Sequence, residues 1–207
     1  MPQATRRSRN KKGEGDRLRH DLVAAAADLL REHGTDAGLS MREVTRRAGV
    51  SAPALYLHFA DGRELVDAVL AQQFAALTER LAAAVATAGD ETEELRAGCR
   101  AYLDFADRDP AMYRLLFEGG ITRRPDQHTG QGAPGRETFD YLVTGIARCQ
   151  RTGAITVADQ QTTATLTWTG LHGIATLRRA HPDFPWPTLD TLLDDLLHRL
   201  TGLPPRP

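Results

Sequence analysis

The sequence predicts an all-α fold, with a small N-terminal bundle of three helices followed by a larger C-terminal helical domain. Apolar residues recur at three- and four-residue spacing through most segments, which is the period of an amphipathic helix. Residue types that begin and end helices separate these segments, and no alternating pattern typical of strands competes with them. A chain of 207 residues is long enough for one large core or two modest ones.

The first segment, residues 1–15, is basic and almost free of apolar side chains. Its five basic residues are Arg6, Arg7, Arg9, Lys11 and Lys12. Such a composition buries too little apolar surface to fold alone, so we expect a disordered tail. A solvated tail and an arm that follows DNA phosphates are both compatible with it.

Three helices are predicted between residues 16 and 59. The first covers residues 16–33 and ends at Gly34. Ser40 with Glu43 forms a capping-box pattern for a second helix over residues 41–47, which Gly49 ends. Ser51 caps a third short helix that reaches residue 59. Two short helices joined by a glycine turn make either a helix-turn-helix, which can enter the DNA major groove, or an ordinary helical hairpin.

The following helices are also marked by their caps. Asp61 starts a helix whose apolar stripe continues to residue 85, so the domain boundary, after residue 78, falls inside this helix. Further helices are predicted over residues 91–107, 111–117, 136–151 and 157–180, with a flexible loop over residues 119–135. Thr188 caps the last helix. The predicted domains are residues 16–78 and 79–203.

Charge is divided unevenly along the chain. Residues 1–60 hold 11 Lys and Arg against 7 Asp and Glu, whereas residues 61–207 hold 15 against 20. A basic head on an acidic body is typical of a nucleic-acid reader with a second domain of another purpose. Cys99 and Cys149 fit no disulfide framework and are expected to be buried free thiols, with redox sensing as the alternative.

Several classes of protein are not supported by the sequence. It shows no signal peptide and no apolar run long enough to span a bilayer, so we expect a cytoplasmic protein without a membrane partner. It contains no G-x-S-x-G, no phosphate-binding glycine loop and no metal-spaced His/Cys cluster, so we expect no enzyme and no cofactor.

Residues 22–77 resemble the N-terminal DNA-binding domain of the tetracycline-repressor (TetR) family. The matching motifs are HG after the first helix, L-S-x-R-E-V, A-G-V-S between the short helices, and L-Y-x-H-F followed by D-x-R-E-L. The resemblance implies a dimer that binds a palindromic operator as a repressor and is released by a small-molecule effector. The alternative is a ligand- or partner-binding helical protein with a degenerate DNA-binding domain.

The resemblance also implies the residues that contact DNA. Ala52, Pro53 and Ala54 match positions that face bases, and such small apolar groups can contact only thymine methyls. Arg42 is the candidate for bidentate recognition of guanine. The positions expected at phosphates are Ser40, Ser51, Tyr56, His58 and Arg63, of which Tyr56 and His58 have a purely structural alternative.

The segment TLTWTGLHGI resembles a W-x-x-L-H-G motif of one TetR subgroup. Trp168 and His172 are four residues apart and share a helix face, where they either line an effector pocket or only pack in the core. The other candidate pocket residues are Tyr102, Phe105, Met112, Phe117, Phe139 and Tyr141.

The last helix carries more leucine than one small bundle needs. In the family the last two helices pair with their symmetry mates. The predicted interface residues are Leu189, Leu192, Leu193, Leu196, Leu197 and Leu200. A ligand in the C-terminal domain would then favour a dimer whose long helix after Asp61 holds the recognition helices at the wrong separation.

Overall fold

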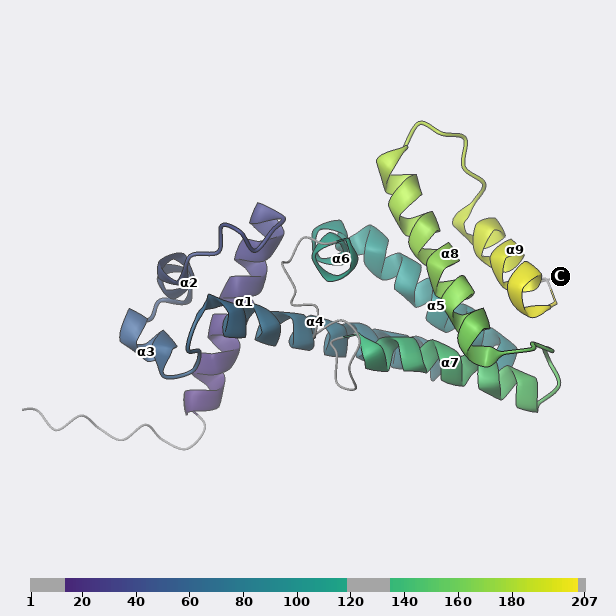
Figure 1. The fold of residues 1–207 in the computed structure, drawn as a ribbon, viewed down its shortest axis with the longest axis horizontal. Coiled ribbons are helices and arrows are strands. Elements are labelled where there is room, and N and C mark those ends of the chain that lie inside the picture. Colours follow the sequence, from purple (N-terminus) through teal and green to yellow (C-terminus); the bar gives the residue numbers. More distant parts are fainter. Residues whose placement is uncertain (1–13, 119–134, 205–207) are drawn as a thin grey trace, which may run out of the picture.

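The computed structural model describes residues 14–118 and 135–204, in which all regular structure is helical (Figure 1). The predicted all-α class is confirmed. The N-terminal helices are α1 (Glu14–His33), α2 (Met41–Ala48) and α3 (Ala52–Tyr56). The remaining helices are α4 (Gly62–Val85), α5 (Glu91–Arg108), α6 (Pro110–Phe117), α7 (Arg136–Arg151), α8 (Gln160–Ala180) and α9 (Leu189–Thr201).

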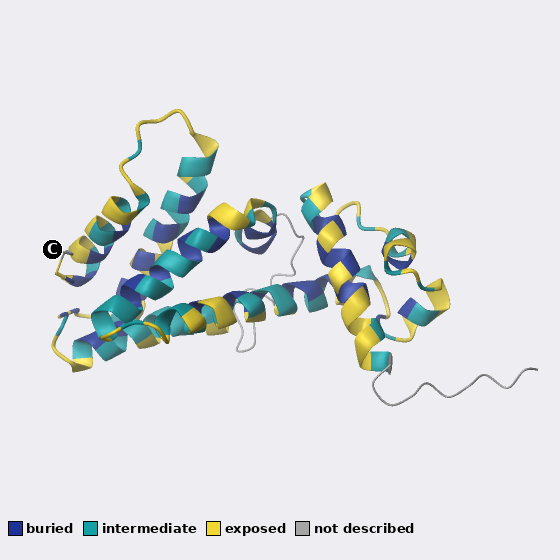
Figure 2. Ribbon diagram, turned by 180° about the vertical axis from the view of Figure 1, so that it is seen from behind, coloured by how far each residue is buried: buried dark blue, intermediate teal, exposed yellow. Residues whose placement is uncertain are grey.

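Helix α4 connects the two ends of the molecule. It starts beside α1 and runs into the C-terminal bundle, where it packs against α5 and α7 (Figure 1). Leu65 and Val69 of α4 are fully buried, as are Leu22 and Leu29 of α1. Burying a side chain of this size contributes about 1.5–3 kcal/mol, which fixes the N-terminal helices on the first turns of α4. Figure 2 shows these buried residues as dark blue bands along both helices.

Three helices, α4, α6 and α9, begin at the side chain that the sequence predicted as a cap. Asp61 accepts a hydrogen bond from the backbone N–H of Glu64 at 2.9 Å, and Asp109 accepts one from Met112 at 3.1 Å. The hydroxyl of Thr188 does the same for Thr191 at 3.1 Å. A cap of this kind stabilises a helix by about 1 kcal/mol.

Several predicted helix boundaries are wrong. Helix α1 begins at Glu14, so the last two residues of the predicted tail are helical. Helix α8 begins at Gln160 rather than at residue 157, because Asp159 caps it by accepting from the Thr162 N–H at 2.7 Å. Helix α3 ends at Tyr56 rather than at residue 59. The N–H groups of His58 and Phe59 both turn back to the Leu55 carbonyl, and this tight turn buries the Phe59 ring.

Helix α5 lies at the centre of the C-terminal bundle. It packs against α4, α6, α7, α8 and α9. Arg96 of α5 is buried and its Nε–H reaches Asp194 of α9 at 3.2 Å, while Arg100 pairs with Asp190 one turn earlier on α9. The two ion pairs have the same four-residue spacing on both helices and therefore set the register of α9 on α5.

Two of the predicted segments fall mainly on residues that the structure does not describe. All five basic residues of the predicted tail lie in residues 1–13, and all but the last residue of the predicted loop lie in residues 119–134; both ranges lie outside the described residues. Within the described residues, no helix combines the length and the apolar character that crossing a membrane requires. The boundary predicted after residue 78 falls within the continuous helix α4 and stays a prediction.

Candidate nucleic-acid interface and aromatic cluster

Helices α2 and α3 lie at the end of the molecule farthest from α8 and α9 (Figure 1). Val44 of α2 and Leu55 of α3 are fully buried and lock the pair onto the rest of the N-terminal bundle. Gly49, in the left-handed region at φ 67°, makes the tight turn between them. An L-residue with a side chain is strained at this φ, so the glycine fixes the angle between the two helices.

The outer surface of this pair presents most of the residues predicted to contact DNA. Two members of that set, Ala54 and His58, are half-buried. The exposed members are Ser40, Arg42, Ser51, Ala52, Pro53, Tyr56 and Arg63. Tyr56 is 56 % exposed, which fits a phenol that reaches outward better than one that packs in the domain.

The capping-box prediction at Ser40 is wrong at the level of side chains. Neither Ser40 nor Ser51 caps its helix with its hydroxyl, although both have the extended backbone of an N-cap residue. Glu43 accepts instead from Arg46 at 3.1 Å, because the guanidinium one turn along α2 offers a charged partner. The two exposed hydroxyls are therefore left for a ligand such as a phosphate oxygen.

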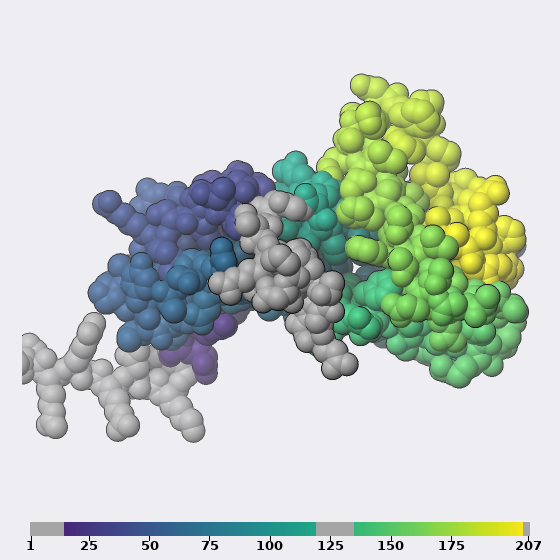
Figure 3. All heavy atoms as spheres, in the orientation of Figure 1, coloured from purple at the N-terminus to yellow at the C-terminus, as the bar shows by residue number. Residues whose placement is uncertain are grey.

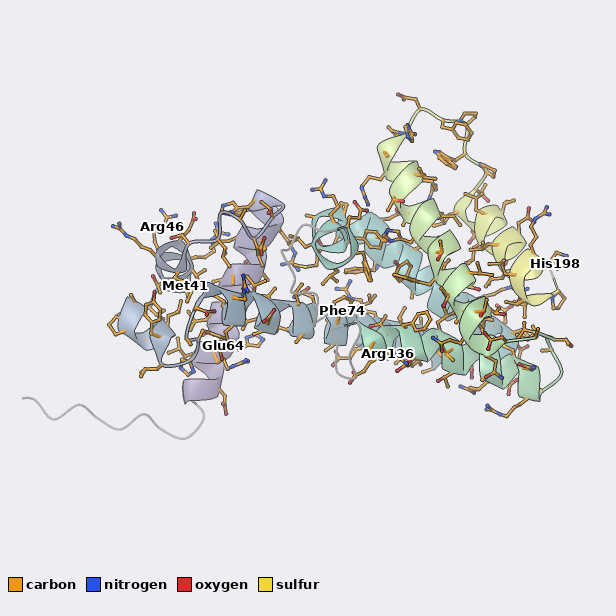
Figure 4. The ribbon with its side chains drawn as sticks, viewed as in Figure 1. Met41, Arg46, Glu64, Phe74, Arg136 and His198 are labelled. Carbon is orange, nitrogen blue, oxygen red and sulfur yellow. The ribbon has the colours of Figure 1, made fainter. Side chains whose placement is uncertain are left out.

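The arginines of α2 differ in their partners. Arg46 pairs with Glu43, and Arg47 makes a two-pronged pair with Glu32 at 2.7 and 2.9 Å. Arg42 is exposed and forms no ion pair with any residue in the described parts of the chain. An exposed guanidinium without an internal carboxylate keeps its forked donors for an outside acceptor. Figure 4 shows Arg46 on the outer side of α2 and Met41 at its start.

Leu57 was missed by the sequence reasoning. It directly follows α3 and is 81 % exposed, beside the exposed Tyr56. The signal that could have found it is the four-residue spacing of Leu55 and Phe59, which predicts one buried face for these two and leaves the residue between them facing away.

A second candidate site is a cluster of aromatic rings between α5, α6, α7 and α8. Tyr113 of α6 stands at its centre, with its ring 5.6 Å from His172 and 5.0 Å from Phe117. Trp168 contacts both His172 at 6.1 Å and Phe139 at 6.2 Å. Six of the predicted pocket residues join this cluster: Tyr102, Phe105, Phe117, Phe139, Trp168 and His172.

Hydrogen bonds run through the cluster as well. The Tyr102 and Tyr113 hydroxyls are 2.9 Å apart, and the Tyr113 hydroxyl is 2.7 Å from Nδ1 of His172. Burial raises the pKa of Tyr102 to about 12, against the opposing effect of hydrogen bonds from Tyr113 and Trp168. Burial also raises the pKa of Tyr113 and lowers the pKa of His172. At neutral pH the cluster therefore holds two neutral phenols and a neutral imidazole.

Two predicted pocket residues lie apart from this arrangement. Met112 is fully buried in the core of α6, and Tyr141 is half-buried on α7 without a ring contact among the described residues. Tyr113, the central residue, was not predicted, although it lies four residues before Phe117 and therefore on the same helix face. A separate open hollow of about 240 Å³ lies between α1 and α4, lined by Arg19, His20 and Gln72 among others, and does not involve the cluster.

Two family models match the chain. The model of tetR-family bacterial regulatory proteins covers residues 22–69, and the tetracyclin repressor-like C-terminal domain model covers residues 95–201. The chain belongs to the tetR family. TetR-family proteins are transcriptional regulators that bind DNA. They form dimers and have small-molecule effectors.

Two curated relatives match this chain over about half of their own length. The HTH-type transcriptional activator FasR of Mycolicibacterium smegmatis is 37 % identical over 110 residues, or 53 % of this chain and 50 % of FasR. The class A tetracycline repressor protein of Escherichia coli (transposon 1721) is 38 % identical over 119 residues, or 58 % of this chain and 49 % of that protein. The chain thus spans about half the length of these relatives.

A solved structure covers the chain more fully. A TetR-family transcriptional regulator from Pectobacterium atrosepticum is 29 % identical, with a TM-score of 0.65, over 95 % of this chain and 100 % of that one. The likeness therefore extends across both the N-terminal helices and the C-terminal bundle of this tetR-family chain.

The predicted dimer leucines of this tetR-family chain divide into two sets. Leu193 and Leu197 are buried in the core of the chain itself, so they are not available to a partner. The half-buried set is Leu189, Leu192, Leu196 and Leu200. Helix α8, which lies beside α9 (Figure 3), exposes Leu166 by 52 % and Leu177 by 49 %.

Proposed function

We propose that the protein is a dimeric repressor that binds a palindromic operator and is released from it by a small-molecule effector. The observation that carries this proposal is the exposed Arg42, which forms no ion pair within the described residues, on the same pair of short helices as the exposed hydroxyls of Ser40 and Ser51. A guanidinium suited to guanine, together with hydroxyls suited to phosphates, is the combination that direct readout of a duplex requires.

The dimer would form through α8 and α9. Helix α8 packs beside α9 and exposes Leu166 and Leu177, and a Cβ added at Gly173 of α8 would meet no atom within 4 Å. A small residue at the centre of a helix face lets a second helix approach closely. A two-fold dimer of this kind would place the two α3 helices about 34–36 Å apart, one turn of DNA.

The effector would act through the aromatic cluster and α6. Tyr113 ties the middle of α6 to His172 of α8, while Asp109 ties its first turn to Arg31 of α1 at 3.0 Å. Phe117, the last residue of α6, meets Phe74 of α4 edge-on at 5.6 Å. A ligand that moved α6 would therefore move both α1 and α4, and a coupling free energy of about 1–3 kcal/mol is typical of such linked sites.

Trp168, Leu171, His172 and Gly173 carry the assignment to the subgroup with a W-x-x-L-H-G motif. Leu171 is buried, and Trp168 and His172 enter the aromatic cluster from the same face of α8. The motif would thus supply one wall of the effector site. The direction of control is the open alternative, because the relative FasR is named an activator.

The test is binding of the purified protein to a fluorescent duplex of its own upstream region, measured by anisotropy across a salt series with excess random duplex. We expect binding that weakens with salt and survives the competitor. Arg42→Ala should remove about 1–3 kcal/mol of discrimination between operator and random duplex. Arg151→Ala is the matched control, since Arg151 is equally exposed but lies at the distal end of α7.

If Arg42→Ala has the same preference for operator over random duplex as the unmodified protein, the result would support the alternative of a degenerate DNA-binding domain. A promoter reporter separates the two directions of control. Deletion of the protein raises transcription from the bound promoter if it is a repressor and lowers transcription if it is an activator.

A further inference from the structure

The hydrogen-bonded run through the cluster has a direction. Tyr102 and Tyr113 each hold one buried hydroxyl proton, and each needs an acceptor. The printed geometry gives each hydroxyl a defined neighbour: the Tyr102 oxygen lies 2.9 Å from the Tyr113 oxygen, and the Tyr113 oxygen lies 2.7 Å from Nδ1 of His172. Both hydroxyl protons find an acceptor only if Tyr102 donates to Tyr113 and Tyr113 donates to Nδ1 of His172.

This direction fixes the tautomer of His172. Since Nδ1 accepts, the single ring proton of the neutral imidazole sits on Nε2. No residue in the described parts of the chain accepts a hydrogen bond from that nitrogen. The run of three side chains therefore ends in one outward donor.

A second donor that lacks an acceptor in the described chain also lies beside Tyr113. Arg179 follows His172 by two turns of α8, and its guanidinium carbon lies 5.7 Å from the centre of the Tyr113 ring. Its Nη2 pairs with Glu118, but its Nη1 is buried and has no acceptor in the described chain. A buried donor without an acceptor costs about 1–3 kcal/mol, so an acceptor supplied from outside would be favoured.

The charges around these donors cancel. The Glu118 carboxylate neutralises Arg179, and Arg178 lies 3.9 Å from Asp107. The imidazole of His172 is neutral at pH 7, because burial lowers its pKa. An anion at this place would meet Glu118 without a net opposing charge, whereas an uncharged acceptor would meet only donors.

The walls beside the donors are aromatic. The Phe117 ring lies 6.2 Å from the His172 ring. Trp168, which also contacts His172, is 38 % exposed. An edge or face of a further ring fits such surroundings, since aromatic pairs at 4.5–7 Å attract one another beyond simple burial.

We infer that the effector is an uncharged aromatic compound whose carbonyl or hydroxyl oxygen accepts from His172 Nε2–H and Arg179 Nη1–H. This inference rests on the proposed effector site and names the chemistry that the site selects. Benzoate and benzamide share the same ring and nearly the same shape and differ in charge. Methyl benzoate adds a second neutral carbonyl.

The chain offers a local probe for this experiment. It has two tryptophans, Trp168 and Trp186, so a Trp186→Phe variant leaves the indole of the cluster as the only one. We expect benzamide and methyl benzoate to change its fluorescence saturably at pH 7.5, with benzoate at least tenfold weaker. Benzoate binding as tightly as benzamide, or no saturable change with either neutral compound, would overturn the inference.

Two substitutions in the same background locate the binding. Arg179→Gln should weaken benzamide about tenfold. Arg148→Gln should leave it unchanged, because Arg148 is also a half-exposed arginine paired with a glutamate of another helix, Glu94, but lies on α7. An equal loss in both variants contradicts the assignment. If Arg179→Gln does not fold, the comparison of benzoate with the two neutral compounds in the Trp186→Phe variant still tests the inference.

Fluorescence anisotropy with the operator duplex on the same preparations distinguishes failure of the inferred effector chemistry from failure of the proposed function. Operator binding with no preference for the neutral compounds refutes this inference alone. Saturable benzamide binding that leaves operator affinity unchanged supports the site chemistry and refutes its proposed role in release.

Discussion

The Nε–H of Arg31 in α1 donates a hydrogen bond of 3.0 Å to Asp109, whose other carboxylate oxygen caps α6. The same guanidinium reaches the side-chain oxygen of Gln73 in α4 at 3.2 Å. One partly buried arginine therefore joins three helices at the place where the N-terminal helices meet the C-terminal bundle.

Arg31→Gln and Asp109→Asn should therefore show coupled effects on stability. Each substitution is expected to lower the free energy of unfolding by about 1 kcal/mol, while Asn keeps an acceptor for the α6 cap. The double variant should lose less than the sum, with a coupling of about 1 kcal/mol. Urea unfolding of the unmodified protein, the two single variants and the double variant measures this coupling. Strictly additive losses of unfolding free energy would show that the contact contributes nothing.

The buried arginine of α5 should be sensitive to loss of its partner. Arg96 pairs with Asp194 and also donates to the Pro204 carbonyl. Asp194→Ala removes one of the two carboxylates that the guanidinium contacts, the other being Glu93, and should cost about 1–3 kcal/mol. Arg96→Met keeps an apolar stem and removes the charge, so its cost should be smaller. Chemical denaturation tests the order, and the reverse order would falsify this account.

The two thiols should react slowly in the folded protein. Burial raises the pKa of Cys99 to about 12 and that of Cys149 to about 11. Little thiolate then exists at pH 8, and the thiolate is the reactive form. An aromatic disulfide reagent should label neither cysteine rapidly until denaturant is added. Rapid labelling of the native protein would revive the redox-sensing alternative.

His172 should make stability depend on pH. Its pKa is lowered from 6.5 mainly by burial, with Glu118 acting in the opposite direction and Arg179 in the same one. The unfolded chain then takes up the proton at a higher pH than the folded chain does, so stability is complete above pH ~6.5 and is lost as pH falls below it. His172→Gln should flatten this part of the curve. Equal slopes in thermal unfolding between pH 7 and pH 5 would contradict the prediction.

The α8 surface should control assembly. Leu166→Glu places a charge on the proposed interface and should raise the dissociation constant of the dimer at least tenfold in sedimentation experiments. Leu57→Glu is the matched control, because Leu57 is an even more exposed leucine on the N-terminal helices. A stable dimer in the Leu166→Glu variant would place the interface elsewhere.

Local signals in the sequence predicted the fold well, because they act within a few residues. Asp61, Asp109 and Thr188 cap the helices expected of them, and Gly49 takes the expected left-handed turn. Contacts between distant residues were out of reach. The Ser40–Glu43 pattern predicted a capping box, but the competing partner Arg46 decides the outcome.

The same difference between local patterns and distant contacts applies to the candidate sites. The exposed set on α2 and α3 was predicted from a long resemblance with fixed spacing. The centre of the aromatic cluster was missed, because Tyr113 becomes important only when α6, α5 and α8 meet in space. The sequence could not separate Leu193 and Leu197 from the other α9 leucines either, since one leucine stripe serves both the core and the outer surface.

Phe74 sits where α4 is held from two sides, by Phe117 of α6 and by the start of α7 at Gly135, whose backbone leaves no room for a Cβ beside the ring (Figure 4). From this point to the first residue of α4 there are 12 positions, or about 18 Å of rigid helix. A tilt of about 10° at Phe74 would carry the far end through about 3 Å, and a two-fold axis would double the change between the recognition helices to about 6 Å. A tilt of this size would thus be enough to put the two recognition helices out of step with successive turns of the DNA helix.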